Sequence, residues 1–159
     1  MRYLLDTNIL IYLIKNRPPA VAERINALPA DDQICMSFVT WAELIKGAER
    51  SNRRDDVRRR LDDLAREVPV VFSTDHLMCE HYAVQSCRLK AAGTPIGGND
   101  LWLASHALAL GATLVTNNQR EFERIVGLAL ANWAQSLRVF RARPSSAHRG
   151  VRSRRKAQP

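Results

Sequence analysis

The sequence has few cysteines, and their spacing excludes two common kinds of site. Cys35, Cys79 and Cys87 are the only three in 159 residues, and no two of them form a CxxC pair. An odd number of scattered cysteines argues against a disulfide framework, and the missing pair spacing argues against a zinc site. We therefore interpret all three as small hydrophobic residues that are buried or half-buried.

Long apolar runs are also missing. No run reaches the roughly 18 residues that a membrane-spanning helix requires. The N-terminal segment MRYLLDTNILIYLIKN is apolar, but Asp6 and Asn8 interrupt it and no small-residue cleavage site follows. We expect a cytoplasmic protein that does not associate with a membrane.

Acidic residues are absent after Glu123, so the net charge of +8 belongs to one end of the chain. Residues 1–135 hold 16 basic and 16 acidic residues and are neutral, whereas the 8 basic residues of 136–159 have no acidic counterpart. Because this tail has few large apolar residues, we predict a domain at 1–135 followed by a disordered tail at 136–159. The tail is either a phosphate-binding extension without sequence preference or an incidental one.

Short apolar runs alternate with helical patterns along the predicted domain. Strands are predicted at 2–5, 34–39, 69–72, 112–117 and 128–133, and helices at 7–16, 20–28, 54–67, 75–92 and 120–125. One further helix is expected to follow Thr40 as its N-cap, and another to begin at Asp100 and end at Gly111. This alternation predicts an α/β domain with a mainly parallel sheet.

Polar residues lie where the predicted strands end. Asp6 ends the first strand, and Asn117 and Asn118 end the fourth. Asp100 opens a helix after a glycine-containing loop, and Glu43 lies one turn into the helix that follows the second strand. Since ligands of parallel sheets bind beyond the carboxyl ends of the strands, we expect these side chains to share one edge of the sheet.

Acids that lie close together repel each other and stay ionised only when a cation neutralises them. Mg²⁺ and Mn²⁺ prefer oxygen ligands, acidify a bound water and offset charge that develops on a phosphate. A cluster without His or Cys therefore suits phosphodiester hydrolysis better than zinc chemistry. Taken singly, each acid has a simpler interpretation: Asp6 and Asp100 as helix N-caps, and Glu43 as a surface residue.

Four segments also carry a resemblance to a known family. LLDTNILIYLIK, SFVTWAELIKGAER, GGNDLWLASHALALGATLVTNNQREFERI and the closing NW, in this order over about residues 3–134, resemble the VapC toxins of the PIN-domain family. The resemblance implies a three-layer α/β/α sandwich around a mainly parallel sheet, a homodimer, and an endoribonuclease that depends on Mg²⁺ or Mn²⁺. It also implies a cognate VapB-like antitoxin whose C-terminal segment covers the acidic groove.

The resemblance assigns roles to the residues near the first strand and to two later acids. Asp6, Glu43 and Asp100 match the acids of the family's metal site. Thr7 and Asn8 match the polar pair that supports the first acid. We expect one ion bound by Asp6 and Asp100, with Glu43 reached through a water that it orients.

The fourth position of the family's acidic set differs here. Asn118 stands where many PIN domains have Asp, although many VapC toxins carry Asn there with an acid shortly after, which is Glu121 in this chain. Thr116 matches the hydroxyl that precedes this position. We count Asn118 among the catalytic residues, and Thr116 and Glu121 among those that support the metal ligands.

Three functions remain open from the sequence. The first is a toxin ribonuclease that cleaves RNA, with tRNA, initiator tRNA included, as the leading substrate, and that contacts DNA only through the complex with its antitoxin. The second is a structure-specific DNA nuclease, whose larger relatives carry more acids and clamp elements that this chain lacks. The third is a non-catalytic regulator that binds nucleic acid or antitoxin, which the retained acids disfavour.

The remaining candidates have structural interpretations. His106 lies within an apolar helical segment and is interpreted as a core or interface residue, and the other three histidines show no ligand spacing. Arginines and aspartates alternate between Arg53 and Asp63, which is typical of an exposed helix face.

Overall fold

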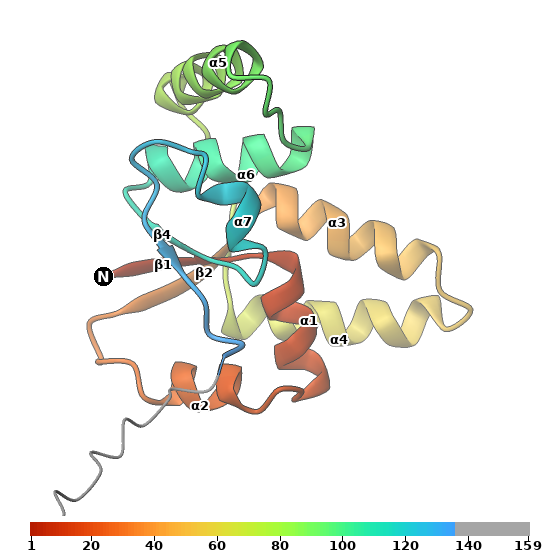
Figure 1. Cartoon of the computed structure of the whole chain (residues 1–159). Coiled ribbons are helices and arrows are strands. Elements are labelled where there is room, and N and C mark those ends of the chain that lie inside the picture. Colours follow the sequence, from red (N-terminus) through yellow and green to blue (C-terminus); the bar gives the residue numbers. More distant parts are fainter. Residues whose placement is uncertain (136–159) are drawn as a thin grey trace, which may run out of the picture.

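The chain folds around a five-stranded sheet in which every neighbouring pair of strands is parallel. The computed structural model describes residues 1–135, so the predicted tail at 136–159 lies outside the described residues (Figure 1). The strand order is β3-β2-β1-β4-β5, with β1 at Arg2–Leu5, β2 at Gln33–Ser37, β3 at Val70–Val71, β4 at Thr113–Val115 and β5 at Leu130–Ala131. The predicted α/β class with a parallel sheet is confirmed.

Two separate cores lie on the two faces of this sheet. Successive side chains of a strand point to opposite faces, and the buried residues divide accordingly. The pairs that divide in this way are Leu4/Leu5, Cys35/Met36 and Leu114/Val115. Because both faces are apolar, helices have to cover both, and the result is the expected three-layer sandwich.

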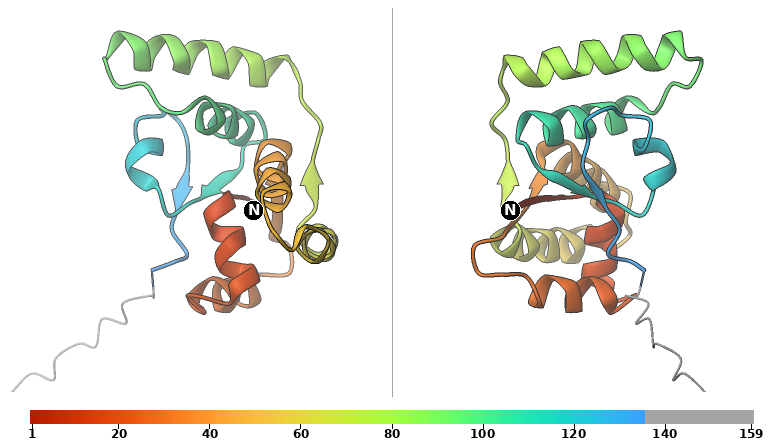
Figure 2. Two further views of the ribbon diagram at one scale, coloured as in Figure 1. Left: turned by 90° about the vertical axis from the view of Figure 1, so that its right-hand side faces the viewer. Right: turned by 60° about the vertical axis from the view of Figure 1, so that its left-hand side comes forward.

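Helices supply the outer layers (Figure 2), and residues 1–135 contain seven of them. They are α1 Thr7–Lys15, α2 Ala20–Asn26, α3 Phe38–Glu49, α4 Arg54–Glu67, α5 His76–Ala91, α6 Gly98–Ala109 and α7 Gln119–Phe122. Helices α1 to α4 contribute to the core on the side of Leu5, and α5 to α7 to the core on the side of Leu4. In the described part of the chain, no helix is both long and apolar enough to cross a membrane.

The strand order creates one position where ligands are expected. From the central β1, the chain adds β2 and β3 on one side, and then crosses to add β4 and β5 on the other. The reversal lies between β1 and β4, where the strands leave a crevice at their carboxyl ends. Asp6 follows β1 and Thr116 follows β4, so both residues lie at this switch point.

Helix α3 begins three residues earlier than predicted. The predicted strand at 34–39 ends at Ser37, which is the actual N-cap and accepts a hydrogen bond from the Val39 N–H at 3.1 Å. Thr40, predicted to be the cap, is fully buried inside the helix. The boundary between β2 and α3 is not visible in the apolar run ICMSFV, because Phe38 and Val39 are as hydrophobic as the strand. The Ser37 hydroxyl caps the helix and ends the strand.

Helix α6 also begins earlier, with Gly97 as its N-cap. Asp100 therefore lies in the first turn of the helix and does not cap it, contrary to its simpler interpretation. Strands β2 to β5 are each shorter than predicted.

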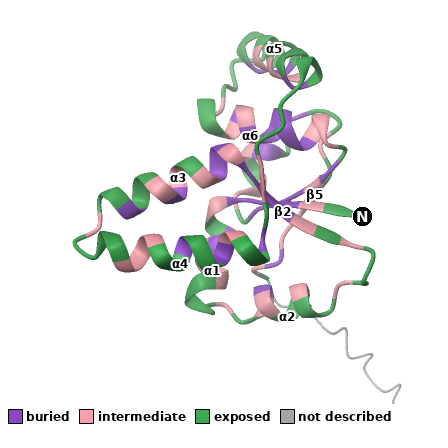
Figure 3. Ribbon diagram, turned by 180° about the vertical axis from the view of Figure 1, so that it is seen from behind, coloured by how far each residue is buried: buried purple, intermediate pink, exposed green. Residues whose placement is uncertain are grey.

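The outermost helix, α5, is largely exposed (Figure 3). It carries Cys79 and Cys87, which are both exposed, so only Cys35 is buried as the sequence interpretation expected. Leu77 and Val84 on the same helix are 41% and 56% exposed. An apolar surface of this kind marks α5 as a face that a partner could cover.

Candidate active site

The first acid of the site is held by hydrogen bonds to both of its oxygens. Asp6 is the N-cap of α1, and its Oδ1 accepts from the Thr7 N–H at 2.6 Å. Its Oδ2 accepts from the Thr116 hydroxyl at 2.8 Å, which ties the end of β1 to the end of β4. Burial raises the pKa of Asp6, the two hydrogen bonds oppose that rise, and the charge of Glu43 adds to it.

Thr116 organises the turn that follows β4. It is fully buried, and its hydroxyl accepts from the Asn118 N–H at 3.0 Å while it donates to Asp6. Asn118 is half-buried beside the site and its side chain makes no hydrogen bond within residues 1–135. The side chain of Asn117 instead forms hydrogen bonds with Tyr12 and Asn132, and not with the site acids.

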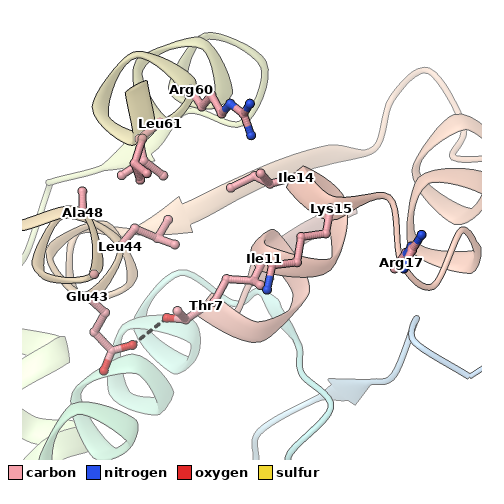
Figure 4. Close-up of a pocket in the computed structure, with 12 residues that line it drawn as sticks. Thr7, Ile11, Ile14, Lys15, Arg17, Glu43, Leu44, Ala48, Arg60 and Leu61 are labelled. Carbon is pink, nitrogen blue, oxygen red and sulfur yellow. Dashed lines mark hydrogen bonds between the residues drawn. The ribbon is translucent and has the colours of Figure 1, made fainter. Parts of the chain in front are cut away.

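The second acid, Glu43, is bound from two sides. Its Oε2 accepts from the Thr7 hydroxyl at 2.6 Å (Figure 4), and its Oε1 accepts from Asn99 Nδ2 at 2.8 Å. Thr7 thus contacts Asp6 through its backbone and Glu43 through its side chain. Asn8 was expected to support Asp6 as well. It is exposed on α1, and its side chain makes no hydrogen bond to any residue of 1–135.

The third acid, Asp100, has a fourth acid as its partner. Burial, a hydrogen bond with Glu121 and the charges of Asp6, Glu121 and Glu43 together raise the pKa of Asp100 to about 7. The structure therefore brings together all four of the acids that the sequence analysis selected.

No cation of the described chain neutralises these four acids. The ion pairs found between residues 1 and 135 lie elsewhere, mainly on α4, and none involves Asp6, Glu43, Asp100 or Glu121. The donor set is made only of oxygens, which suits Mg²⁺ or Mn²⁺. Among the described residues, however, no three His, Cys, Asp or Glu side chains already converge as direct ligands.

Sequence reasoning missed Asn99. Its side-chain amide donates a hydrogen bond to Glu43. This bond connects α6, which carries Asp100, to α3, which carries Glu43. A polar residue next to Asp100 in the first turn of α6 was the available signal. Glu121 was expected in a supporting role, and it lies near enough to Asp100 to raise the pKa of that carboxyl.

A groove of about 710 Å³ adjoins the acids (Figure 4). It begins at Thr7 and Glu43 and runs between α1 and the α3–α4 pair. Apolar side chains line most of it: Ile11, Ile14, Leu44, Ala48, Val57 and Leu61. Lys15, Arg17 and Arg60 also line it, and none of these three forms an ion pair with another described residue.

Comparison with known proteins defines the class of the chain. Residues 3–128 match the family model of the PIN domain. Ribonuclease VapC1 of Haemophilus influenzae is 47% identical over 135 residues, which cover 85% of this chain and 100% of that protein. The tRNA(fMet)-specific endonuclease VapC of Shigella flexneri is 37% identical over 134 residues, covering 84% of this chain and 99% of that protein.

The solved structures agree. The structure of VapBC-1 from nontypeable Haemophilus influenzae has a TM-score of 0.80 and 47% sequence identity, and the match covers 85% of this chain and 100% of that chain. The chain belongs to the VapC group of the PIN-domain family, as the resemblance predicted.

Proposed function

We propose that this chain is the toxin of a type II toxin–antitoxin pair and acts as a Mg²⁺-dependent endoribonuclease. One observation carries the proposal: four acids from β1, α3, α6 and α7 gather at the switch point of the sheet with no described cation among them. The names of the relatives support the same activity, since they are a ribonuclease and a tRNA endonuclease.

Asp6 and Asp100 are the residues that would hold the ion, with Mn²⁺ as a substitute for Mg²⁺. When bound, such an ion supplies charge that stabilises a developing phosphorane and lowers the pKa of a water. The raised pKa of Asp100 fits this role, because a dication near the carboxylate would offset the burial and the neighbouring negative charges that raise it. Asn118 and Thr116 would shape the surroundings of the ion.

The chain's own residues would then orient the reactants. Thr7 and Asn99 fix both oxygens of Glu43, which leaves their remaining lone pairs to accept from the attacking water. That water would attack the phosphorus in line with the O3′ atom, whose bond to phosphorus breaks. The products are a 5′-phosphate and a 3′-hydroxyl.

The substrate that we propose is structured RNA, with tRNA and initiator tRNA as the first candidates. The support is the 37% identity to a tRNA(fMet)-specific endonuclease. Residues 1–135 are formally neutral, so this domain has no excess of cations for binding a long duplex. We therefore assign any contact with promoter DNA to the complex with the antitoxin. Cleavage of RNA also agrees with a cytoplasmic location.

The partner that we propose is a VapB-like antitoxin whose C-terminal segment covers the site. The groove beside Glu43 suits such a segment, because its apolar walls would take apolar side chains and Lys15, Arg17 and Arg60 would meet acidic ones. A peptide in this groove would reach Thr7 and Glu43 and exclude RNA. The solved VapBC-1 structure supports a partner of this kind.

We also propose a homodimer. Leu77 and Val84 are exposed seven residues apart on α5, and Phe72, before that helix, is 65% exposed. Burying these side chains against a second copy would stabilise the assembly through the hydrophobic effect. Sedimentation of the purified chain measures the assembly directly.

The decisive experiment expresses the chain without its antitoxin and sequences the 5′ ends of cellular RNA. We expect growth arrest and a discrete cut site, both lost in Asp100→Ala. Asp63→Asn, which changes an exposed acid on α4, is the matched control and should retain both effects. Cleavage of DNA alone would favour the structure-specific nuclease, and arrest without any cleavage would favour the non-catalytic regulator. Either result would contradict the proposal.

A further inference from the structure

Two hydrogen bonds join α3 to α6, and they lie at the two ends of the contact. The exposed one is the bond from Asn99 Nδ2 to Glu43 Oε1 at the acidic site. The buried one joins Ser37 Oγ and His106 Nδ1 at 2.9 Å, and these residues are 0% and 1% exposed. The early part of α3 thus meets the late part of α6, so the helices run in opposite directions.

The two bonds are separated by similar lengths on both helices. At 1.5 Å per residue, the interval from Ser37 to Glu43 spans about 9 Å, and that from Asn99 to His106 about 10.5 Å. Two attachments at matched spacing fix the angle between two helices, whereas one attachment leaves them free to pivot. The buried bond is therefore placed to control how Asn99 meets Glu43.

Ser37 has the hydrogen-bonding capacity for both of its partners. Its oxygen accepts from the Val39 N–H as the N-cap of α3, which leaves its proton free to donate to His106 Nδ1. The ring must then be neutral and carry its proton on Nε2. Burial lowers the pKa of His106, although the Ser73 backbone and the charge of Asp75 oppose this effect, and the Phe38 ring packs at a centroid distance of 5.7 Å.

The other ring nitrogen faces a small cavity. His106 Nε2 is buried and has no hydrogen-bond partner among the described residues, since the nearby Ser73 backbone falls short of bonding geometry. The cavity has about 90 Å³ and is lined by Ser73, Thr74 and Asp75 among others. A water needs only about 10–15 Å³ for its centre and two to four polar partners. The cavity exceeds this volume, and Ser73, Thr74 and Asp75 bring polar groups to its lining.

We propose that His106 is a positioning residue, which through its hydrogen bond to Ser37 holds α6 against the start of α3 so that Asn99 and Asp100 meet Glu43. The catalytic part of this inference rests on the proposed ribonuclease function. His106 itself touches neither substrate nor reacting atoms, and acts through the two helices.

The test compares three variants of the full chain on an RNA substrate. His106→Phe keeps a buried ring but removes the acceptor, and should lower kcat by about 10- to 100-fold while KM changes by less than about twofold, because small displacements of reacting groups are costly. His106→Asn places an amide oxygen near the position of Nδ1 and should recover most of the loss.

Ser105→Ala is the matched control. Ser105 is a buried neighbour on the same helix, but its hydroxyl bonds only to the Leu101 carbonyl of α6 at 2.7 Å. We expect kcat within about twofold of the wild type, because no link to α3 is lost. His106→Phe cleaving RNA as fast as Ser105→Ala would overturn the proposal, and so would a failure of His106→Asn to exceed His106→Phe.

A second measurement separates this proposal from the proposed function. In ¹⁵N NMR of the wild type, His106 should show a single neutral tautomer protonated at Nε2, with Nδ1 as an acceptor, and Ser37→Ala should abolish that acceptor signal. A ring that averages between tautomers in the wild type would overturn the inference. A wild type that cleaves no RNA yet shows the fixed tautomer would contradict the ribonuclease and leave the link between α3 and α6 supported.

Discussion

Aspartates in two regions of this molecule have opposite environments. On α4, Asp56 accepts a hydrogen bond from Arg53 at 2.9 Å and pairs with Arg59; these partners lower its pKa. At the switch point, burial and neighbouring acids raise the pKa of Asp100 to about 7. Asp55, Asp56 and Asp63 of α4 are paired with arginines at the surface, whereas the site acids form no ion pair with another described residue. This difference supports the proposal that the site acids, and not those of α4, bind an added cation.

The largest expected effect separates the two regions by activity. Asp6→Asn keeps the shape and the hydrogen-bond acceptor of the N-cap but removes a charge from the site. We expect RNA cleavage to fall by more than about 100-fold, because losing even a supporting partner of a metal ligand typically costs about 10- to 100-fold. Asp56→Asn should cleave at the wild-type rate. Initial rates on one RNA substrate, with Mn²⁺ affinity by calorimetry, measure both; equal rates for the two variants would remove the distinction between the regions.

A second prediction concerns the hydroxyl that holds Asp6. Thr116→Val removes the donor to Asp6 Oδ2 and should lower activity by about 10- to 100-fold. Thr40→Val is the matched control, since Thr40 is also fully buried but its hydroxyl has no hydrogen-bond partner in the described structure. Its loss should leave activity unchanged and stability equal or higher. Similar activity losses in both variants would show that general packing, and not the bond to Asp6, is responsible.

The third prediction uses pH. In the metal-free protein, the pKa of Asp100 lies near 7, above its ordinary value of 3.8, so the folded state binds a proton more tightly than the unfolded state. The resulting stability is complete below 3.8 and is lost as the pH rises through about 7. The thermal unfolding midpoint should therefore decrease as the pH rises from about 5 to about 8. Asp100→Asn should make that decrease smaller.

Asp56 has the opposite sign and serves as the comparison. Because its pKa is lowered, its contribution to stability is present above 3.8 and is lost only as the pH falls below that value. Above about pH 5, the thermal unfolding midpoint of Asp56→Asn should therefore change with pH as it does in the wild type. Thermal unfolding in a chelating buffer measures both variants, and an unchanged slope in Asp100→Asn would assign the pH dependence to another group.

The smallest expected effect concerns Gly97, the N-cap of α6, whose backbone lies next to the Asp100 carboxylate. A Cβ atom at Gly97 would lie 3.2 Å from Asp100 Oδ2, so the carboxylate would have to move by a few tenths of an ångström. Gly97→Ala should lower activity by about two- to tenfold, as a small misplacement of a site group. At Gly98 a Cβ would meet nothing within 4 Å, so Gly98→Ala should cleave normally. Equal rates for both variants in the same assay would show that Gly97 has no role in placing Asp100.

Much of the fold was predictable because its signals are local. The apolar runs and helical periodicity located all five strands and all seven helices of residues 1–135, and with them the parallel α/β class. The boundaries of α3 were wrong, because an apolar run does not show where a serine ends a strand. The exposure of Cys79 and Cys87 was also unpredictable, since it depends on how far α5 stands from the sheet.

The site divides in the same way. Asp6, Glu43 and Asp100 could be selected from their positions after strands and at helix starts. The contacts of Thr7, Asn99 and Glu121 could not, because each joins elements that lie far apart in the chain.

The sequence by itself determined the helices and strands, the parallel class of the sheet and the candidate site acids, since periodicity and residue type act over a few neighbouring positions. Only the tertiary structure decided which acids share one environment, which of them have a raised pKa, and how α3 is attached to α6. Those properties depend on burial and on distances between side chains that approach each other only when the sheet and its helices pack.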